Sequence, residues 1–168
     1  MFIADAIDRL NSFVGKLVSY AIWIGMVVVV YEVVMRYAFN APTLWAQGYM
    51  QRIFAGYFIL IGAYTLIERG HVRVDLLLNG RSPRWSAFLD MINYAVLLLW
   101  TGALAYEGWF YFNDAWRFGE RDDGALGHVL WPVKLALLVG VVLMALQGLA
   151  EMMRAAARLW RPEEGRPS

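Results

Sequence analysis

Cysteine is absent from this 168-residue sequence, and the only histidines are His71 and His128. The absence of cysteine excludes disulfides, zinc–thiolate sites, iron–sulfur clusters and a cysteine nucleophile. Two histidines alone are too few for most metal sites. Haem would need axial histidines that face each other inside a bundle, whereas these two fall in loops predicted on opposite membrane faces. The sequence therefore predicts no metal and no cofactor, and it argues against a haem-anchor subunit.

Charged residues are also scarce. Only 17% of the residues are charged, against about 25% in an average soluble domain, and 60% are hydrophobic. The mean hydropathy is +0.47. This composition excludes a disordered chain, and a net charge of +1 without a basic stripe argues against a nucleic-acid partner. A domain of this size buries too little surface to hide so many apolar residues, so we predict a small integral membrane protein.

Four apolar stretches predict an all-α fold with four transmembrane helices in a single membrane domain over residues 1–168. Their aromatic and singly charged flanks bring them close to the roughly 20 residues that span a bilayer. The predicted spans are about 13–35, 45–67, 88–112 and 129–153. Charged residues at their edges could snorkel to the interface: Lys16, Glu32, Arg52, Glu107, Lys134 and Glu151. A soluble four-helix bundle is the alternative, but it would need a polar face on every helix, and runs such as 135–145 are apolar all round.

The connections between the spans are rich in turn residues. Residues 40–42 (Asn-Ala-Pro) break the chain after the first span, because the residue before proline avoids helical backbone angles. Pro83 suits the first helical position of the third span. A polar, acidic stretch over 119–127 joins the last two spans, and the polar tail 161–168 is expected to fray.

Lysine and arginine are divided unequally between the two membrane faces. With four spans, both termini and the connection at 70–84 share one face, which holds ten Lys and Arg residues, whereas the other face holds five. The positive-inside rule places the more basic face in the cytoplasm. We therefore expect both termini to be cytoplasmic.

Glu32 and Arg36 are four residues apart, with the acid first, which is the favoured order for an ion pair on one helix face. An intramembrane acid can also carry protons, so a small stand-alone ion-coupled transporter that uses Glu32 is the alternative function. Arg52, beside Gln47 near the start of the second span, could reach Glu32 or a lipid phosphate. We interpret it as a structural or partner-facing residue.

The segment after the second span alternates polar and apolar residues. His71, Arg73 and Asp75 are interleaved with valines and followed by three leucines. This pattern predicts a short amphipathic segment on the cytoplasmic membrane surface, and an ordinary basic loop is the alternative.

Motifs of enzymes and of transport sites are missing. The sequence contains no nucleophile elbow, no zinc-protease motif and no phosphate-binding glycine loop, so we predict that the chain is not an enzyme. It also contains no broken helix of the kind that holds a solute at mid-membrane. Two pairs of small residues at helical spacing, Ala21/Gly25 and Ala136/Gly140, are expected to pack within the bundle. The residues alone thus predict a four-span subunit without chemistry of its own.

Several segments, in chain order, resemble the small membrane subunit of tripartite ATP-independent periplasmic (TRAP) transporters. The first are 36–42 (Arg-Tyr-Ala-Phe-Asn-Ala-Pro), Trp45 and 70–75 (Gly-His-Val-Arg-Val-Asp). The later ones are Trp116 with Glu120, then 131–134 (Trp-Pro-Val-Lys) and 146–148 (Leu-Gln-Gly). The later pattern looks closest to the branch of the family that handles keto acids and similar organic acids.

The resemblance implies a noncatalytic scaffold in the bacterial inner membrane. Its implied partners are a large TRAP membrane subunit, a periplasmic solute-binding protein and membrane lipids, in a sodium-driven importer of an organic acid. One departure stands out: the family often has an acidic residue where this chain has Gln47 or Gly48. The polar groups expected to fix assembly are Arg36, Asn40, Trp45, Gln47 and Arg52 at the outer end, and His71, Arg73 and Asp75 on the cytoplasmic side.

Overall fold

A computed structural model describes residues 2–67, 83–124 and 126–160 of the chain. Its four helices are α1 (Phe2–Tyr37), α2 (Ala46–Ile67), α3 (Pro83–Phe118) and α4 (Trp131–Trp160). Each is long and apolar enough to cross a membrane. The predicted all-α fold with four transmembrane helices is therefore confirmed. The amphipathic segment predicted between α2 and α3, with its basic-loop alternative, lies outside the described residues, as does the tail 161–168.

Three of the helices extend beyond the predicted spans. α1 begins at Phe2 and not near residue 13, α3 begins at Pro83 and not near residue 88, and α4 runs on to Trp160. At 1.5 Å per residue, the 36 residues of α1 and of α3 each extend about 54 Å, whereas a hydrocarbon core is roughly 30 Å thick. The extra turns carry charged side chains such as Asp8 and Arg154, which a search for apolar runs leaves out.

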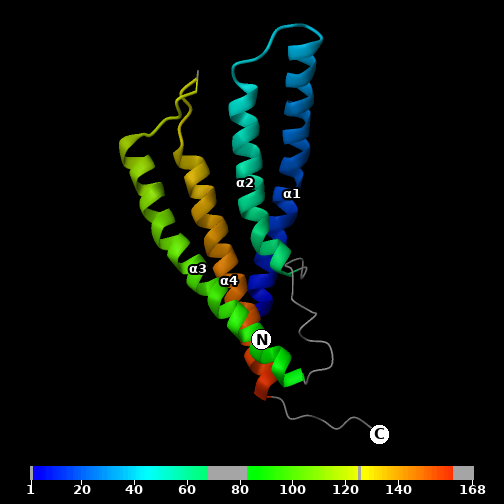
Figure 1. The fold of residues 1–168 in the computed structure, drawn as a ribbon, viewed down its shortest axis with the longest axis vertical. Coiled ribbons are helices and arrows are strands. Elements are labelled where there is room, and N and C mark those ends of the chain that lie inside the picture. Colours follow the sequence, from blue (N-terminus) through cyan, green and yellow to red (C-terminus); the bar gives the residue numbers. More distant parts are fainter. Residues whose placement is uncertain (1, 68–82, 125, 161–168) are drawn as a thin grey trace.

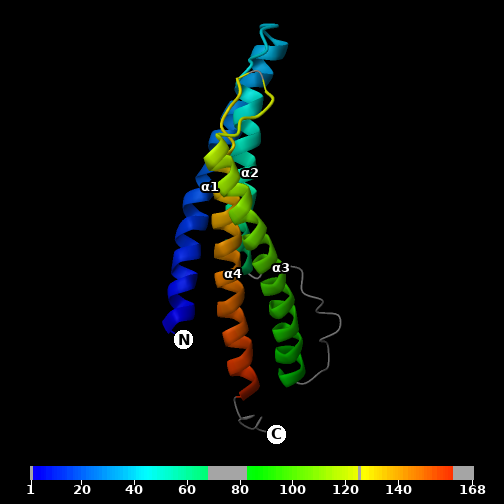
Figure 2. The ribbon, with the colours of Figure 1, turned by 90° about the vertical axis from the view of Figure 1, so that its left-hand side faces the viewer.

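The helices form two antiparallel hairpins, α1 with α2 and α3 with α4 (Figure 1). In this view the hairpins approach each other near the chain termini and diverge toward the end that holds the connections 38–45 and 119–130. We call the latter the connection end and the opposite one the terminal end. In the perpendicular view, α1 and α3 instead separate toward the terminal end (Figure 2).

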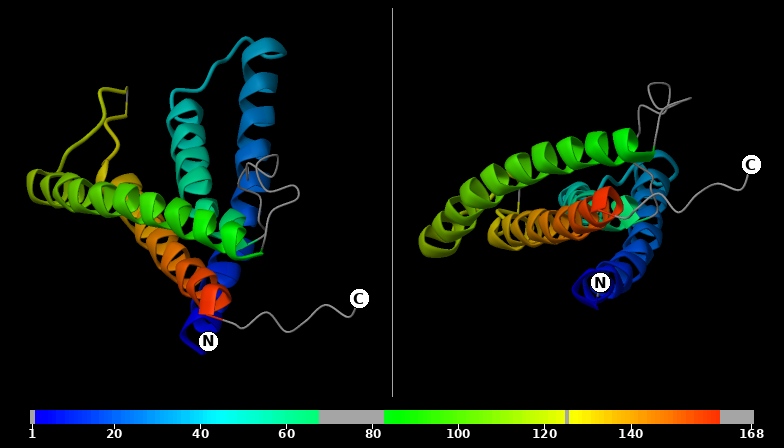
Figure 3. Two further views of the ribbon diagram at one scale, coloured as in Figure 1. Left: turned by 60° about the horizontal axis from the view of Figure 1, so that its bottom comes forward. Right: turned by 90° about the horizontal axis from the view of Figure 1, so that it is seen from below.

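α4 is the central helix of the bundle. It packs on α1, α2 and α3, whereas α3 packs on α4 alone among the described helices. Seen along the bundle, α4 lies between α3 and the first turns of α1 (Figure 3). Most of the circumference of α3 is therefore open to the surroundings.

Glycines allow close approach at the seams between helices. A Cβ atom at Gly140 in α4 would lie 2.8 Å from the backbone oxygen of Ile59 in α2, and one at Gly15 in α1 would lie 2.5 Å from the ring of Tyr64. Gly25 likewise faces the ring of Phe54. The prediction that small residues at helical spacing pack inside the bundle is thus confirmed for Gly25 and Gly140.

The distribution of side chains suits a protein surrounded by lipid. Large apolar side chains cover the outside, and Val27 and Leu99 are 69% and 73% exposed. The largest fully buried side chains are polar: Asn11, Thr101 and Gln147. A bilayer solvates apolar side chains and leaves polar ones to find partners inside the protein, which is the arrangement seen here.

Candidate functional site

The predicted outer group of assembly residues lies at the connection end. Arg36 is in the last turn of α1, Asn40 and Trp45 are in the connection that follows, and Gln47 and Arg52 are in the first two turns of α2. The site is thus built from the end of one helix, a short turn and the start of the next.

The turn after α1 depends on Asn40, whose backbone adopts a φ of 51°. This left-handed conformation is uncommon for residues other than glycine, and asparagine tolerates it better than most. The amide of Ala41 then donates to the carbonyl of Met35 at 2.9 Å, which closes the end of the helix. The turn brings Thr43 back against the side of α1.

Glu32 is the acceptor at the centre of this turn. Its Oε1 accepts from Nε and Nη2 of Arg36, at 3.1 and 2.6 Å, and its Oε2 accepts from the amide and hydroxyl of Thr43, at 3.2 and 2.5 Å. The predicted ion pair between Glu32 and Arg36 is confirmed. With 4% of the residue exposed and both oxygens bonded, Glu32 holds the connection to α1, and nothing in this geometry supports a proton carrier.

Arg52 pairs with a residue that the sequence analysis did not connect to it. Its Nη2 donates to Oδ2 of Asp122 at 2.5 Å, and its Nη1 donates to the carbonyl of Gly48 at 2.9 Å. Glu32, one of the two partners suggested for Arg52, is not its partner in the structure, because Arg36 and Thr43 already occupy both Glu32 oxygens. The absence of a side chain at Gly48 leaves room for the guanidinium, since a Cβ there would lie 3.1 Å from Nη1.

Asp122 organises the connection between α3 and α4. Its Oδ1 accepts from the amide of His128 at 2.9 Å, and its own amide donates to the carbonyl of His128 at 2.9 Å. The bond from Arg52, aided by the His128 backbone amide and by the positive charge of Arg52, holds the pKa of Asp122 below its usual value despite partial burial. The carboxylate therefore stays ionised at neutral pH and ties this connection to α2.

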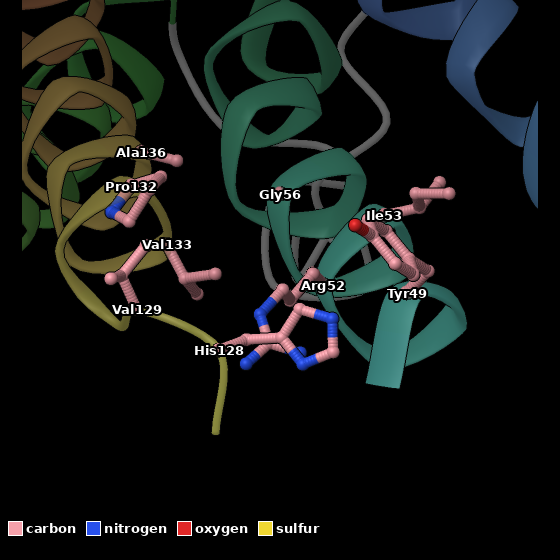
Figure 4. Close-up of a pocket in the computed structure, with 9 residues that line it drawn as sticks. All are labelled: Tyr49, Arg52, Ile53, Gly56, His128, Val129, Pro132, Val133 and Ala136. Atoms are coloured by element: carbon pink, nitrogen blue, oxygen red, sulfur yellow. The ribbon is translucent and has the colours of Figure 1, made fainter. Parts of the chain in front are cut away.

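Two hollows border the Arg52–Asp122 contact. The first, about 490 Å³, is the more polar of the two and is lined by Arg36, Gln47, Gln51 and Asp122 among others. The second, about 420 Å³, is a mainly apolar groove between α2 and the start of α4, and Arg52 and His128 lie at its polar edge (Figure 4). The half-exposed Arg36 and the exposed Gln47 therefore share one pocket, while Arg52 borders the other.

Aromatic rings connect the elements of this end. Trp45 stacks on Tyr31 of α1 at 5.7 Å and meets Tyr49 of α2 edge-on at 6.0 Å. Tyr49 in turn meets the His128 ring at 5.0 Å. Trp45 thus takes part in a series of ring contacts from α1 to the last connection.

Trp116, Glu120 and the segment 131–134, which carry part of the family resemblance, also meet here. The rings of Trp116 and Trp131 pack edge-on at 5.1 Å, and Lys134 forms an ion pair with Glu120 while lying 4.9 Å from the centre of the Tyr111 ring. These contacts join the end of α3 to the start of α4, so the motif has a structural role within the hairpin.

A second polar cluster, at the terminal end, was missed by the sequence analysis. Nδ2 of Asn11 donates to Oε1 of Gln147 at 2.7 Å, and Nε2 of Gln147 donates to Oδ1 of Asp8 at 2.8 Å. Arg154 donates to Oδ2 of Asp8 at 2.5 Å and also pairs with Glu151. A signal was available: Gln147 is the one amide in an otherwise apolar run, and such a side chain inside a membrane span needs a partner.

The same end holds an ion pair between Arg158 of α4 and the buried Asp90 of α3, at 3.0 Å. Together with the contacts of Asp8, it links α4 to helices on both sides. His71, Arg73 and Asp75, predicted to anchor the cytoplasmic side, lie outside the described residues.

The described polar groups mainly hold the helices of this chain together. Within residues 2–67, 83–124 and 126–160, no group of three or more histidine and acidic side chains is placed to hold a metal ion. The polar clusters lie at the two ends of the bundle, where they fix the geometry of the hairpins.

Comparison with known proteins bears on this arrangement. The family profile described as "Tripartite ATP-independent periplasmic transporters, DctQ component" matches residues 25–158, which include the last third of α1, all of α2 and α3, and nearly all of α4. No curated protein matches the chain. The matched region contains the whole connection end, whereas the first turns of α1, with Asp8 and Asn11, precede it.

Proposed function

The chain belongs to the family of DctQ components of tripartite ATP-independent periplasmic transporters, and we propose that it is the noncatalytic scaffold subunit of such a transporter. The observation that carries the proposal is the family match over residues 25–158, which is most of the 168-residue chain. Members of this family are components of transporters. Together with the four apolar helices of this chain, the family indicates a multi-pass protein of the inner membrane.

The proposed role is mechanical. In a tripartite system, a periplasmic binding protein delivers the solute and a large membrane subunit carries it, and we assign this chain to hold that subunit at a fixed depth and tilt. The contacts at both ends suit a rigid support, because Arg52–Asp122, Asp8–Arg154 and Asp90–Arg158 each link different parts of the bundle. We propose an organic acid as the solute and a sodium gradient as the energy source.

The orientation is part of the proposal. The ten-to-five division of Lys and Arg favours cytoplasmic termini, which would put the connection end in the periplasm. The polar pocket of Arg36 and Gln47 would then face the compartment of the binding protein. A reporter fused after Ser168 and one inserted within 119–127 should report opposite sides of the membrane, and a shared side would overturn the topology.

The predicted assembly residues of the cytoplasmic side remain a proposal. His71, Arg73 and Asp75 form the polar positions of a segment whose apolar side suits the headgroup region. Replacing Arg73 and Asp75 together by Ala should lower co-purification or uptake while the preferred solute stays the same.

The central experiment is a pair of measurements on the purified subunit. A tagged small subunit should retain the large subunit through detergent purification, whereas alone it should show no saturable binding of any solute that the transporter carries. Failure to retain the large subunit, or saturable solute binding by this chain alone, would overturn the proposal.

A further inference from the structure

An unusual line of residues runs along the outside of α3. Asn93, Trp100, Glu107 and Asp114 are spaced seven residues apart, and all four are exposed. Residues seven apart on an α-helix drift by only about 20°, so these four side chains share one face. Three of the four are polar or charged, although α3 is a membrane-crossing helix.

This line lies beside the contact with α4 and is not part of it. Thr101, Gly108 and Ala115 are buried against α4, and they form a parallel line displaced by one residue, or about 100° of helix rotation. Because α3 packs on no other described helix, the line of Asn93, Trp100, Glu107 and Asp114 is not covered by another described helix.

Glu107 lies within the predicted span 88–112, directly after the charge-free run 91–106. Its neighbour Gly108 faces Leu137 and Leu138 of α4, where a Cβ would lie 3.3 Å from the Leu137 side chain. Trp116, which packs on Trp131 at the connection end, is nine residues further along, or about 13 Å at the helical rise.

Glu107 also differs in its partners from the acids that join parts of the bundle. Glu32, Asp90 and Asp122 each accept bonds from an arginine. Within the described residues, Glu107 has no hydrogen bond and no ion pair, although its side chain is exposed on the helix. A carboxylate in contact with lipid inside a span is costly, and acids inside membrane spans normally face protein or a water-filled cavity.

We propose that the α3 face made by Asn93, Trp100, Glu107 and Asp114 is the surface on which the large subunit docks, with one of its transmembrane helices covering Glu107. The carboxylate determines the chemistry required of that helix, which places an arginine, a lysine or a hydroxyl donor opposite Glu107. This inference rests on the proposed scaffold function and adds to it the helix and the residue that make the contact.

A photo-crosslinking experiment on the assembled complex tests the surface. Benzoyl-phenylalanine replaces Trp100, which is 62% exposed, and in a matched variant it replaces Leu17, which is 61% exposed on α1. The Trp100 variant should give an adduct with the large subunit, and the Leu17 variant should not. A complex that co-purifies normally but gives no adduct at Trp100 would overturn the surface and leave the scaffold function standing. If the unmodified chain retained no large subunit at all, the proposed function would fail, and this surface with it.

The carboxylate is tested by two substitutions. Glu107→Leu should lower the recovery of the large subunit about tenfold, the effect of removing a buried hydrogen bond to a charged group. Glu107→Gln, which keeps an acceptor of the same shape, should retain more of the complex than Glu107→Leu. If Glu107 instead faces lipid or reaches the interface, Glu107→Leu would leave recovery unchanged or raise it, and the proposal would be wrong. The melting temperature of the isolated subunit should be unaffected in both variants, which separates assembly from folding.

Discussion

The guanidinium of Arg52 and the carboxylate of Asp122, 70 residues apart in sequence, form a 2.5 Å hydrogen-bonded ion pair. Arg52 belongs to the α1–α2 hairpin, and Asp122 belongs to the connection of the α3–α4 hairpin. The two hairpins diverge toward this end (Figure 1), so the contact joins them where the helices themselves separate. Arg52 lines the apolar groove and Asp122 lines the more polar pocket, so the contact borders both.

We expect Asp122→Asn to loosen the connection end while the helices stay intact. The amide cannot neutralise Arg52, and its nitrogen cannot accept from the guanidinium or from the His128 amide. Protection of the 120–130 amides against hydrogen exchange should fall, and the helical circular dichroism should not change. The exchange Arg52→Asp with Asp122→Arg should restore part of the protection. Equal protection in wild type and Asp122→Asn would show that the ion pair contributes nothing.

The pH dependence of this contact follows from the direction of the pKa shift. The bond from Arg52 lowers the pKa of Asp122 in the folded state, so its stabilisation is complete above the ordinary aspartate value of about 3.9 and is lost as the pH falls through the lower folded value. The difference in melting temperature between wild type and Asp122→Asn should therefore be constant from about pH 5 to pH 8. It should shrink only below about pH 4. A difference that disappears near neutral pH would contradict the assignment.

Glu32→Gln should leave uptake by the assembled transporter largely intact. The amide oxygen can still accept from Thr43, although the charge that attracts Arg36 is gone. Glu32→Ala should be more harmful, because it leaves both partners without an acceptor. The measurement is solute uptake normalised to the amount of assembled complex. Complete loss of uptake in a normally assembled Glu32→Gln variant would favour a proton-carrying role and count against the scaffold.

The buried amide pair of Asn11 and Gln147 should be coupled energetically. Asn11→Leu leaves a buried Gln147 oxygen without its donor, and Gln147→Leu removes a donor from Asp8. Hydrogen bonds between transmembrane helices average about 0.6 kcal/mol and reach about 1.7 kcal/mol, so each single variant should lose about 1 kcal/mol of unfolding free energy. The double variant should lose less than the sum of the two, as measured by unfolding in detergent. Strict additivity would show that the bond is energetically silent.

Local patterns in the sequence predicted much of the fold. Four apolar runs gave the four helices, and the four-residue spacing of Glu32 and Arg36 gave their ion pair, because both depend only on residues close in the chain. The helix ends were harder to predict from the sequence, since the first turns of α1 carry polar residues and are held by contacts of Asp8 and Asn11 with α4.

Contacts between distant parts of the chain could not be predicted from the sequence. Several acidic residues could lie close to Arg52 in a plausible four-helix bundle. Only the way in which the two hairpins pack together selects Asp122 as its partner. The same holds for Asn11 and Gln147, which are 136 residues apart. Where a single sequence supplies no pairing information, a charged residue in a span predicts that a partner exists without saying which one.

The seam between α2 and α4 gives a prediction with a built-in control. A Cβ at Gly140 would lie 2.8 Å from the backbone oxygen of Ile59 and 3.1 Å from its carbonyl carbon, and backbone atoms cannot move aside as a side chain can. Gly140→Ala should therefore force the helices apart and lower the unfolding free energy, despite the better helix propensity of alanine. At Gly102 in α3 nothing lies within 4 Å of the added Cβ, so Gly102→Ala should keep the propensity gain of up to about 1 kcal/mol. Unfolding of the isolated subunit in detergent should thus give effects of opposite sign for one chemical change, and the same sign at both positions would mean that α2 and α4 do not meet at Gly140.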